Sequence, residues 1–206
     1  INLLSRFYDV DEGSILVDGN DLREINIHSL RKKMGIVLQD NYLFSGSVME
    51  NIRYGRQDAT NEEVVAAAKK VGAHDFIMSL PKQYDTEVEE RGSLLSIGQK
   101  QLIAFTRALI RDPPVLILDE ATSAVDPYSE LIIQEALEVL LKNRTSISIA
   151  HRLSTIINSD KIFCLKDGEI VESGSHGELI KNPNGLYTQL FTLQFRDAYK
   201  SENEIE

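Results

Sequence analysis

A run of four apolar residues that ends in two carboxylates constrains this chain more than any other feature. Val115-Leu116-Ile117-Leu118 is followed directly by Asp119 and Glu120. A continuous apolar run of this length is typical of a strand that is buried on both faces of a sheet. Two adjacent carboxylates repel each other and are costly to remove from water. The pattern predicts a buried strand that ends either in a site for a cation and a general base, or in two solvated acids with Glu120 capping the next turn.

Other segments have the pattern of strands, and two of them also end in polar residues. Residues 34–38 form an apolar run that ends at Gln39, and residues 146–150 form one that ends at His151. Residues 14–19 predict a strand that ends in a turn. A hairpin is predicted further along, from residues 161–165 and 169–173 joined through Asp167-Gly168.

Helical patterns separate these strands. Thr60 and Glu63 have the spacing of a capping box that begins a helix. Asp126 is followed by Pro127, which is a favourable N-cap and first helical residue. The remaining helices are expected over residues 74–80, 96–112 and 127–143. Strands that alternate with helices predict an α/β fold with a mostly parallel sheet, in which ligands bind beyond the carboxyl ends of the strands.

The mainly helical stretch in the middle of the chain is predicted to be a subdomain inserted into this sheet fold. The predicted division is a first part of the core over 1–47, the helical subdomain over 48–112, the second part of the core over 113–195 and a polar tail over 196–206. Residues 1–8 have helical spacing but no capping residue before them. We therefore expect the N-terminal part of the fold to be missing from this chain.

Composition narrows the classes of function. The chain has 206 residues and a formal net charge of −10 with no basic block, which argues against binding to nucleic acid. No apolar run approaches the roughly 18 residues that are needed to cross a bilayer. The single cysteine, Cys164, lies in an apolar stretch and is expected to be a small buried hydrophobe.

Ser96 and Gln99 have the spacing of a second capping box. A helix N-terminus also offers free amide groups that suit a phosphate, and Gly98 would let a ligand approach the backbone closely. A cap alone and a phosphate site both remain open for this segment. Gln39 and His151 are equally open, because each is either a structural residue or a ligand to a metal or phosphate.

Five segments, in this order, resemble the motifs of the nucleotide-binding domain of an ATP-binding cassette (ABC) transporter. They are the Q-loop at 37–40, the signature motif at 95–99, Walker B at 116–120, the D-loop at 123–126 and the switch histidine at 150–152. The resemblance covers nearly the whole chain and implies a P-loop NTPase (RecA-like) core. Ile97 stands where the signature motif usually has its first glycine.

Two further segments are similar to the exporter branch of that family. Residues 43–52 resemble the stretch after the Q-loop, and residues 86–92 resemble the X-loop, which touches the coupling helices of the membrane domains. Glu89 stands where that loop usually has glycine. No G-x-x-x-x-G-K-[ST] sequence occurs, so the Walker A loop is expected upstream of Ile1, and this segment alone is expected to bind ATP very poorly.

The resemblance implies ATP as the substrate and Mg²⁺ as the metal. Asp119 and Gln39 would hold the metal, and Glu120 would act as the general base. His151 would contact the terminal phosphate, so that Glu120, His151 and Gln39 form the catalytic set. ATP hydrolysis would drive export across a membrane.

In this family two nucleotide-binding domains meet head to tail. Ser96, Gly98 and Gln99 would then face the nucleotide of the partner, and Asp126 would belong to the D-loop. The implied partners are a second nucleotide-binding domain, in a homodimer or a heterodimer, and transmembrane domains reached through coupling helices. The implied place is the cytoplasmic face of the cell membrane.

Three other interpretations remain. An ABC importer ATPase would be a separate polypeptide docked on a permease. A soluble ABC ATPase of translation or chromosome maintenance would be revealed by co-purification with ribosomes or DNA. A non-catalytic regulatory domain would show no ATPase activity in the full protein, although Glu120 and His151 argue against it.

Overall fold

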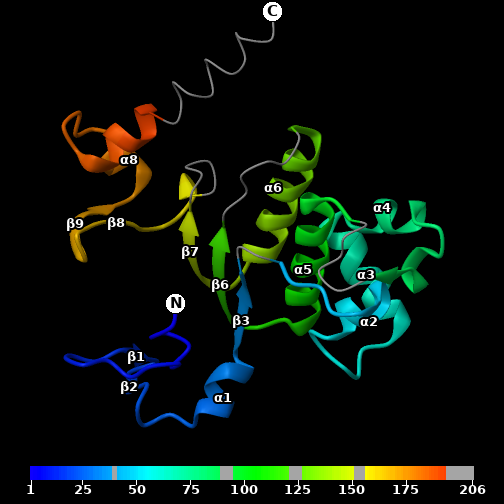
Figure 1. Cartoon of the computed structure of the whole chain (residues 1–206). Helices are drawn as coiled ribbons and strands as arrows, with labels where there is room; N and C mark the ends of the chain where they lie inside the picture. The colour runs from blue at the N-terminus through cyan, green and yellow to red at the C-terminus, as the bar shows by residue number, and fades with distance from the viewer. Residues whose placement is uncertain (39–40, 89–94, 121–126, 151–155, 194–206) are drawn as a thin grey trace, which may run out of the picture. The chain divides into compact units, whose positions relative to one another are not determined.

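The computed structural model describes residues 1–38, 41–88, 95–120, 127–150 and 156–193; at Glu120, Pro127 and Ala150 the description covers the backbone. These residues form two compact units (Figure 1). The first unit contains the described residues up to Ile149 apart from Glu120, and the second contains Glu120 and those after Ile149. The division predicted at residues 47, 112 and 195 stays a prediction.

The first unit is built on a sheet of three strands, β3 (Met34–Val37), β6 (Val115–Glu120) and β7 (Thr145–Ala150), in the order β3-β6-β7. β3 pairs with β6 in parallel, with Met34 opposite Val115 and Val37 opposite Leu118. The three arrows point the same way in Figure 1. The apolar run that opened the sequence therefore forms the central strand, as predicted.

Strand β6 is buried on both of its faces. Leu116 and Leu118 belong to the large core that contains the helices, whereas Ile117 belongs to a second core on the opposite face. Side chains of successive strand residues point to opposite faces, so the alternation follows directly from the geometry of a strand. The second core is completed by Leu22, Leu30 and residues near the N-terminus.

Helices cover the sheet on the side of the large core. α5 (Ile97–Arg111) packs on β3 and α6 (Pro127–Leu141), and its other side contacts α2 (Val48–Arg53) and α3 (Asn61–Val71), which is followed by α4 (His74–Ser79). Figure 1 shows α5 and α6 between the sheet and these three shorter helices. The mainly helical character predicted for the middle of the chain is confirmed for its described residues.

The predicted capping boxes fix where two of these helices begin. The backbone N–H of Thr60 donates to the Glu63 carboxylate at 2.9 Å, and the Thr60 hydroxyl accepts from the Glu63 N–H. Gly72, with φ at 76°, ends the same helix in the left-handed conformation that favours glycine. The start of α3 predicted from the capping box at Thr60 is thus confirmed.

The helix predicted over residues 1–8 is too long. Residues 1–5 form a single hydrogen-bonded turn that ends at Arg6, whose backbone is left-handed with φ at 51°. The N–H of Phe7 bonds to the carbonyl of Asn2 at 2.9 Å, which is the long hydrogen bond of a Schellman motif. The apolar spacing continues past this point, but the backbone leaves the helix.

Several short elements were not predicted from the sequence or are shorter than predicted. They are the hairpin of β1 (Leu16–Val17) and β2 (Asn20–Asp21), α1 (Ile27–Lys32), the antiparallel pair of β4 (Gly46–Ser47) and β5 (Glu87–Val88), and the 3-10 turn at Gln83–Asp85. Strand β5 lies within residues 48–112, which the sequence predicted to be mainly helical. Its partner lies 40 residues away, and two residues carry no alternating pattern.

The second unit contains the predicted hairpin, formed by β8 (Ile162–Lys166) and β9 (Glu169–Gly174). Asp167 and Gly168 both have positive φ, as a two-residue type I′ turn requires. The short helix α8 (His176–Leu179) and a helical stretch over residues 186–193 complete this unit. Cys164 is buried in its core, and burial raises the pKa of the thiol, so the prediction of a small hydrophobe is confirmed.

Among the described helices, none is both long and apolar enough to cross a membrane.

Candidate functional site

Asp119 marks the carboxyl edge of the sheet in the first unit. It follows three buried residues of β6 and is itself half-buried, and Glu120 is the last residue of the strand. The adjacent strand β3 ends at Val37, opposite Leu118, so the two strands end side by side. A half-buried carboxylate at this edge offers oxygen ligands, which suit a hard cation that keeps water ligands.

Three residues predicted for this site lie outside the described part of the chain. They are Gln39, Asp126 and His151, and the side chain of Glu120 is likewise outside it. Among the described residues, no group of three or more His, Cys, Asp or Glu side chains is placed to hold a metal. The described part of the site therefore supplies one carboxylate, Asp119, and the roles of the other four stay predictions.

The N-terminus of α5 contains the second predicted group. The Ser96 hydroxyl accepts from the N–H of Gln99 at 3.2 Å, and the Ser96 N–H donates to Gln99 Oε1 at 3.0 Å. Both halves of the capping box are thus formed. Ser96 is nevertheless exposed, Ile97 beside it is 55% exposed, and the first turn contains no acidic residue. An exposed helix end without a carboxylate keeps the positive potential that attracts an anion.

Ser96 and Asp119 lie toward the same edge of the first unit. α5 is followed after three residues by β6, which runs back along the helix toward that edge (Figure 1). No hydrogen bond joins Ser96, Gly98 or Gln99 to Asp119 within the described residues. The two predicted groups are therefore separate parts of one edge.

An aromatic pocket lies between β3, α5 and the segment that leads into α2. This aromatic pocket has a volume of about 280 Å³, and its lining includes Leu38, Tyr42, Phe44, Tyr54 and Arg107. The Tyr42 and Phe44 rings meet edge to face with centroids 5.2 Å apart, and the Phe44 and Tyr54 centroids are 4.5 Å apart. All three rings remain about half exposed. In the sequence, residues 43–52 were identified only through their resemblance to the stretch after the Q-loop of ABC exporters.

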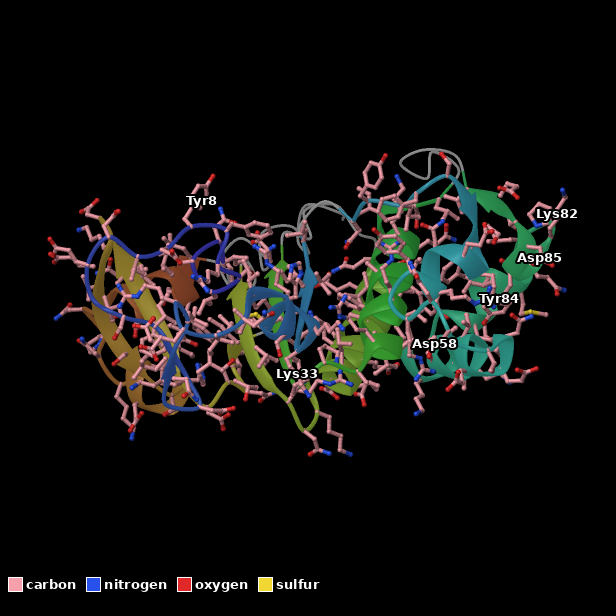
Figure 2. All side chains as sticks on the ribbon, turned by 90° about the horizontal axis from the view of Figure 1, so that it is seen from below. Tyr8, Lys33, Asp58, Lys82, Tyr84 and Asp85 are labelled. Carbon is pink, nitrogen blue, oxygen red and sulfur yellow. The ribbon has the colours of Figure 1, made fainter. Side chains whose placement is uncertain are left out.

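The described start of the predicted X-loop is attached to the same segment. Thr86 accepts a hydrogen bond from the N–H of Val48 at 3.0 Å, and Val88 pairs with Gly46. Just before it, the buried Tyr84 hydroxyl bonds to His74 Nδ1 at 2.9 Å, and burial raises the pKa of Tyr84 to about 12. Figure 2 shows Tyr84 at one end of the unit, near the exposed Lys82 and Asp85. Residues 89–92, with Glu89, lie outside the described residues.

Comparison with known proteins decides the family. The family model described as "ABC transporter" matches residues 1–123, which include Ser96, Gly98, Gln99, Asp119 and Glu120. The chain belongs to the ABC transporter family. Its fold is that of an ABC ATPase domain, a P-loop NTPase fold, as the motifs predicted.

Individual members of the family are closely similar to this chain. A Staphylococcus aureus (strain NCTC 8325) protein, whose name places it with the multidrug export ATP-binding/permease proteins, is 57% identical over 94% of this chain. An uncharacterised ABC transporter ATP-binding protein of Bacillus subtilis (strain 168), YfiC, is 55% identical over the same share. A solved bacterial Atm1-family ABC exporter with ATP bound matches with a TM-score of 0.85 and 48% identity.

These matches cover 94% of this chain but only 33%, 32% and 34% of the three proteins. The ABC chain described here spans about a third of the length of each relative. The name of the Staphylococcus aureus relative contains both an ATP-binding and a permease part, and the solved structure is named as an exporter.

Proposed function

We propose that this chain binds and hydrolyses ATP as the nucleotide-binding domain of an ABC exporter. The observation that carries the proposal is the pair Asp119-Glu120 at the end of a buried parallel strand, inside the region that matches the ABC family. The export direction is supported by relatives that are named for export and that join an ATP-binding part to a permease. An importer ATPase would be a separate polypeptide, which makes it the weaker candidate.

The residues at the sheet edge divide the chemistry between them. Asp119, with its single described carboxylate, fits Mg²⁺, which is usually bound by one or two carboxylates together with phosphates and waters. The metal would neutralise charge on the phosphates. Glu120 would take the proton of the attacking water as the general base, Gln39 would hold the metal and that water, and His151 would hydrogen-bond the terminal phosphate.

A second nucleotide-binding domain completes the site. Ser96 and Ile97 at the start of α5 are exposed although Gly98 is buried, and the free amides of this helix end suit the terminal phosphate of an ATP molecule held by the partner. Ser96, Gly98 and Gln99 therefore act on the partner's nucleotide, and Asp126 belongs to the contact between the two domains. The partner is either a second copy of this chain or a related domain.

The aromatic pocket is the binding site of a helix from the transmembrane domain. Three half-exposed rings around a pocket of about 280 Å³ form an apolar surface that a short helix from the permease part would cover. The described start of the X-loop is joined to the same segment by the bond from Val48 to Thr86. We infer from this arrangement that the chain acts at the cytoplasmic face of the membrane that contains the permease.

The substitution Glu120→Gln tests the proposed chemistry in the transporter that contains this chain. Because general-base catalysis contributes roughly 10²–10⁴-fold, ATPase turnover should fall at least about a hundredfold. ATP should still be bound, since the amide keeps the size and shape of the carboxylate, and bound nucleotide is measured after rapid gel filtration. Glu138→Gln, at an exposed carboxylate of α6, is the matched control and should leave turnover unchanged. Unchanged turnover in E120Q would contradict the assignment of Glu120.

A further inference from the structure

Arg107 joins α5 to the segment that forms the aromatic pocket. Its Nε donates to the carbonyl of Asn51 at 2.9 Å, and its Nη2 donates to Asn51 Oδ1 at 3.0 Å. Its Nη1 donates to the carbonyl of Tyr42 at 3.1 Å. One side chain from α5 therefore holds both ends of the stretch from residue 42 to 51.

Asn51 closes this stretch from the inside. It is 2% exposed, and its Nδ2 donates to the carbonyls of Phe44 and Ser47 at 2.9 and 3.0 Å. Its Oδ1 accepts from the N–H of Phe44 at 2.9 Å, as well as from Arg107. The backbone between residues 44 and 47 is thus wrapped around one buried amide, and that amide is fixed to Arg107.

The guanidinium of Arg107 is held without a carboxylate partner among the described ion pairs. It lies 5.5 Å from the ring centroid of Phe44 and 5.7 Å from that of Tyr54. Burial lowers the pKa of Arg107 from its ordinary value. A partly buried cation whose partners among the described residues are carbonyls and ring faces is costly to retain for packing alone. Its fork of donors, in contrast, suits the fixing of three acceptors at once.

The backbones of the two elements also touch at this point. A Cβ atom added to Gly55, just beyond α2, would lie 2.1 Å from the carbonyl oxygen of Arg107. The segment 42–55 therefore contacts α5 through both the side chain and the main chain of one residue. The N-terminus of the same helix is the exposed end with Ser96.

We propose that Arg107 is a positioning residue that makes the segment 42–55 and α5 move as one body. Binding of a helix in the aromatic pocket then determines the position of the N-terminal end of α5 at Ser96. In the other direction, nucleotide contact at Ser96 changes the conformation of the pocket. This inference rests on the proposed function, in which the aromatic pocket binds a helix of the permease part and Ser96 contacts a nucleotide.

The test measures hydrogen exchange of the amides of residues 42–55 in the transporter that contains this chain. The E120Q background holds ATP and Mg²⁺, and exchange is compared with and without the nucleotide. Arg107→Gln is expected to reduce the ATP-dependent change in exchange about tenfold, because hydrogen bonds to a charged donor are lost. Arg107→Lys keeps the charge but not the fork, and it should lose part of the change.

Arg31→Gln is the matched control. Arg31 also donates to two backbone carbonyls, those of Ser5 at 3.1 Å and Arg6 at 3.0 Å, and its guanidinium lies 4.6 Å from the ring centroid of Phe7, but it is not part of the pocket lining. The control should keep the full ATP-dependent change. Loss of the change in R31Q to the same degree as in R107Q would overturn the proposal, and so would no change in the E120Q parent.

Retained ATP is measured in every variant, so that two failures are told apart. If the parent transporter retains no ATP, the proposed function fails. If it retains ATP and R107Q behaves like the parent, the positioning role of Arg107 fails alone. If R107Q unfolds, R107K decides: a full ATP-dependent change in folded R107K overturns the proposal, and a partial change supports it.

Discussion

At the scale of single residues, a structural and a functional role can belong to the same side chain. The Ser96 hydroxyl is engaged in its capping box, yet the residue is exposed at the start of α5, whose first turn contains no acidic residue. The two roles differ in what they require. A cap needs only an oxygen that accepts a hydrogen bond, whereas contact with a phosphate excludes a negative charge.

Ser96→Asp and Ser96→Ala separate these roles. Aspartate is as good an N-cap as serine, so S96D should keep the thermal stability of the wild type. It should lose ATPase activity, because its carboxylate repels the partner's nucleotide. S96A should lose about 0.5–2 kcal/mol of stability through the missing cap, in addition to activity. Stability is measured by thermal unfolding, and activity by phosphate release.

Thr60→Ala is the control for the cap. Thr60 heads the same kind of box on α3, away from the Ser96 end, and its loss should cost a similar stability. The turnover of T60A should equal that of the wild type at temperatures where it is folded. Full ATPase activity in S96D would show that the end of α5 is only a cap.

At the scale of elements, the packing of α2 on α5 depends on a close approach of their backbones. A Cβ atom at Gly55 would lie 2.1 Å from the Arg107 carbonyl oxygen and 2.9 Å from a methyl group of Ile110. Gly55→Ala should therefore destabilise the protein by about 1–3 kcal/mol, the usual range for overpacking. Urea unfolding measures the change.

Gly177→Ala is the matched substitution in α8. No atom lies within 4 Å of a Cβ placed at Gly177, so this change should be neutral or slightly stabilising. Equal stabilities of the two variants would mean that the contact between residues 55 and 107 relaxes without cost.

The same scale explains which elements could be predicted from sequence. Thr60 and Ser96 begin helices of 11 and 15 residues, and the apolar spacing that follows each cap identifies the helix. Ser47 and Ser175 have the same capping box, but their helices have only six and four residues. So few residues show no period, and the cap alone was not a sufficient signal.

The residues of the candidate site also differ in how well the sequence predicts their place in the fold. Asp119 and Ser96 lie at the ends of strongly patterned elements, so sequence alone placed them correctly on a strand end and a helix start. The bond from Arg107 to Tyr42 spans 65 positions, and local pattern cannot predict such a contact. The available signal was the single charge of Arg107 within the apolar stretch of α5, which marks a partly buried residue that requires partners.

At the scale of the whole molecule, Ser96 and Glu120 act on different nucleotides in the proposed dimer. Glu120 serves the nucleotide of its own domain, and Ser96 serves that of the partner. If both residues served the same nucleotide, a single chain would hold a complete set. The two arrangements predict opposite results when two differently tagged copies of the transporter are combined in one dimer.

In the first combination, one copy contains S96D and the other contains E120Q. If Ser96 acts on the partner's nucleotide, both substitutions fall in one site and the other site is intact. In the second combination, one copy contains both substitutions and the other is wild type, and each site then has one defect. We expect ATPase activity in purified mixed dimers of the first kind and at least about a hundredfold less in the second. Activity in the second combination but not in the first would place Ser96 and Glu120 at the same nucleotide, and the head-to-tail arrangement would be rejected.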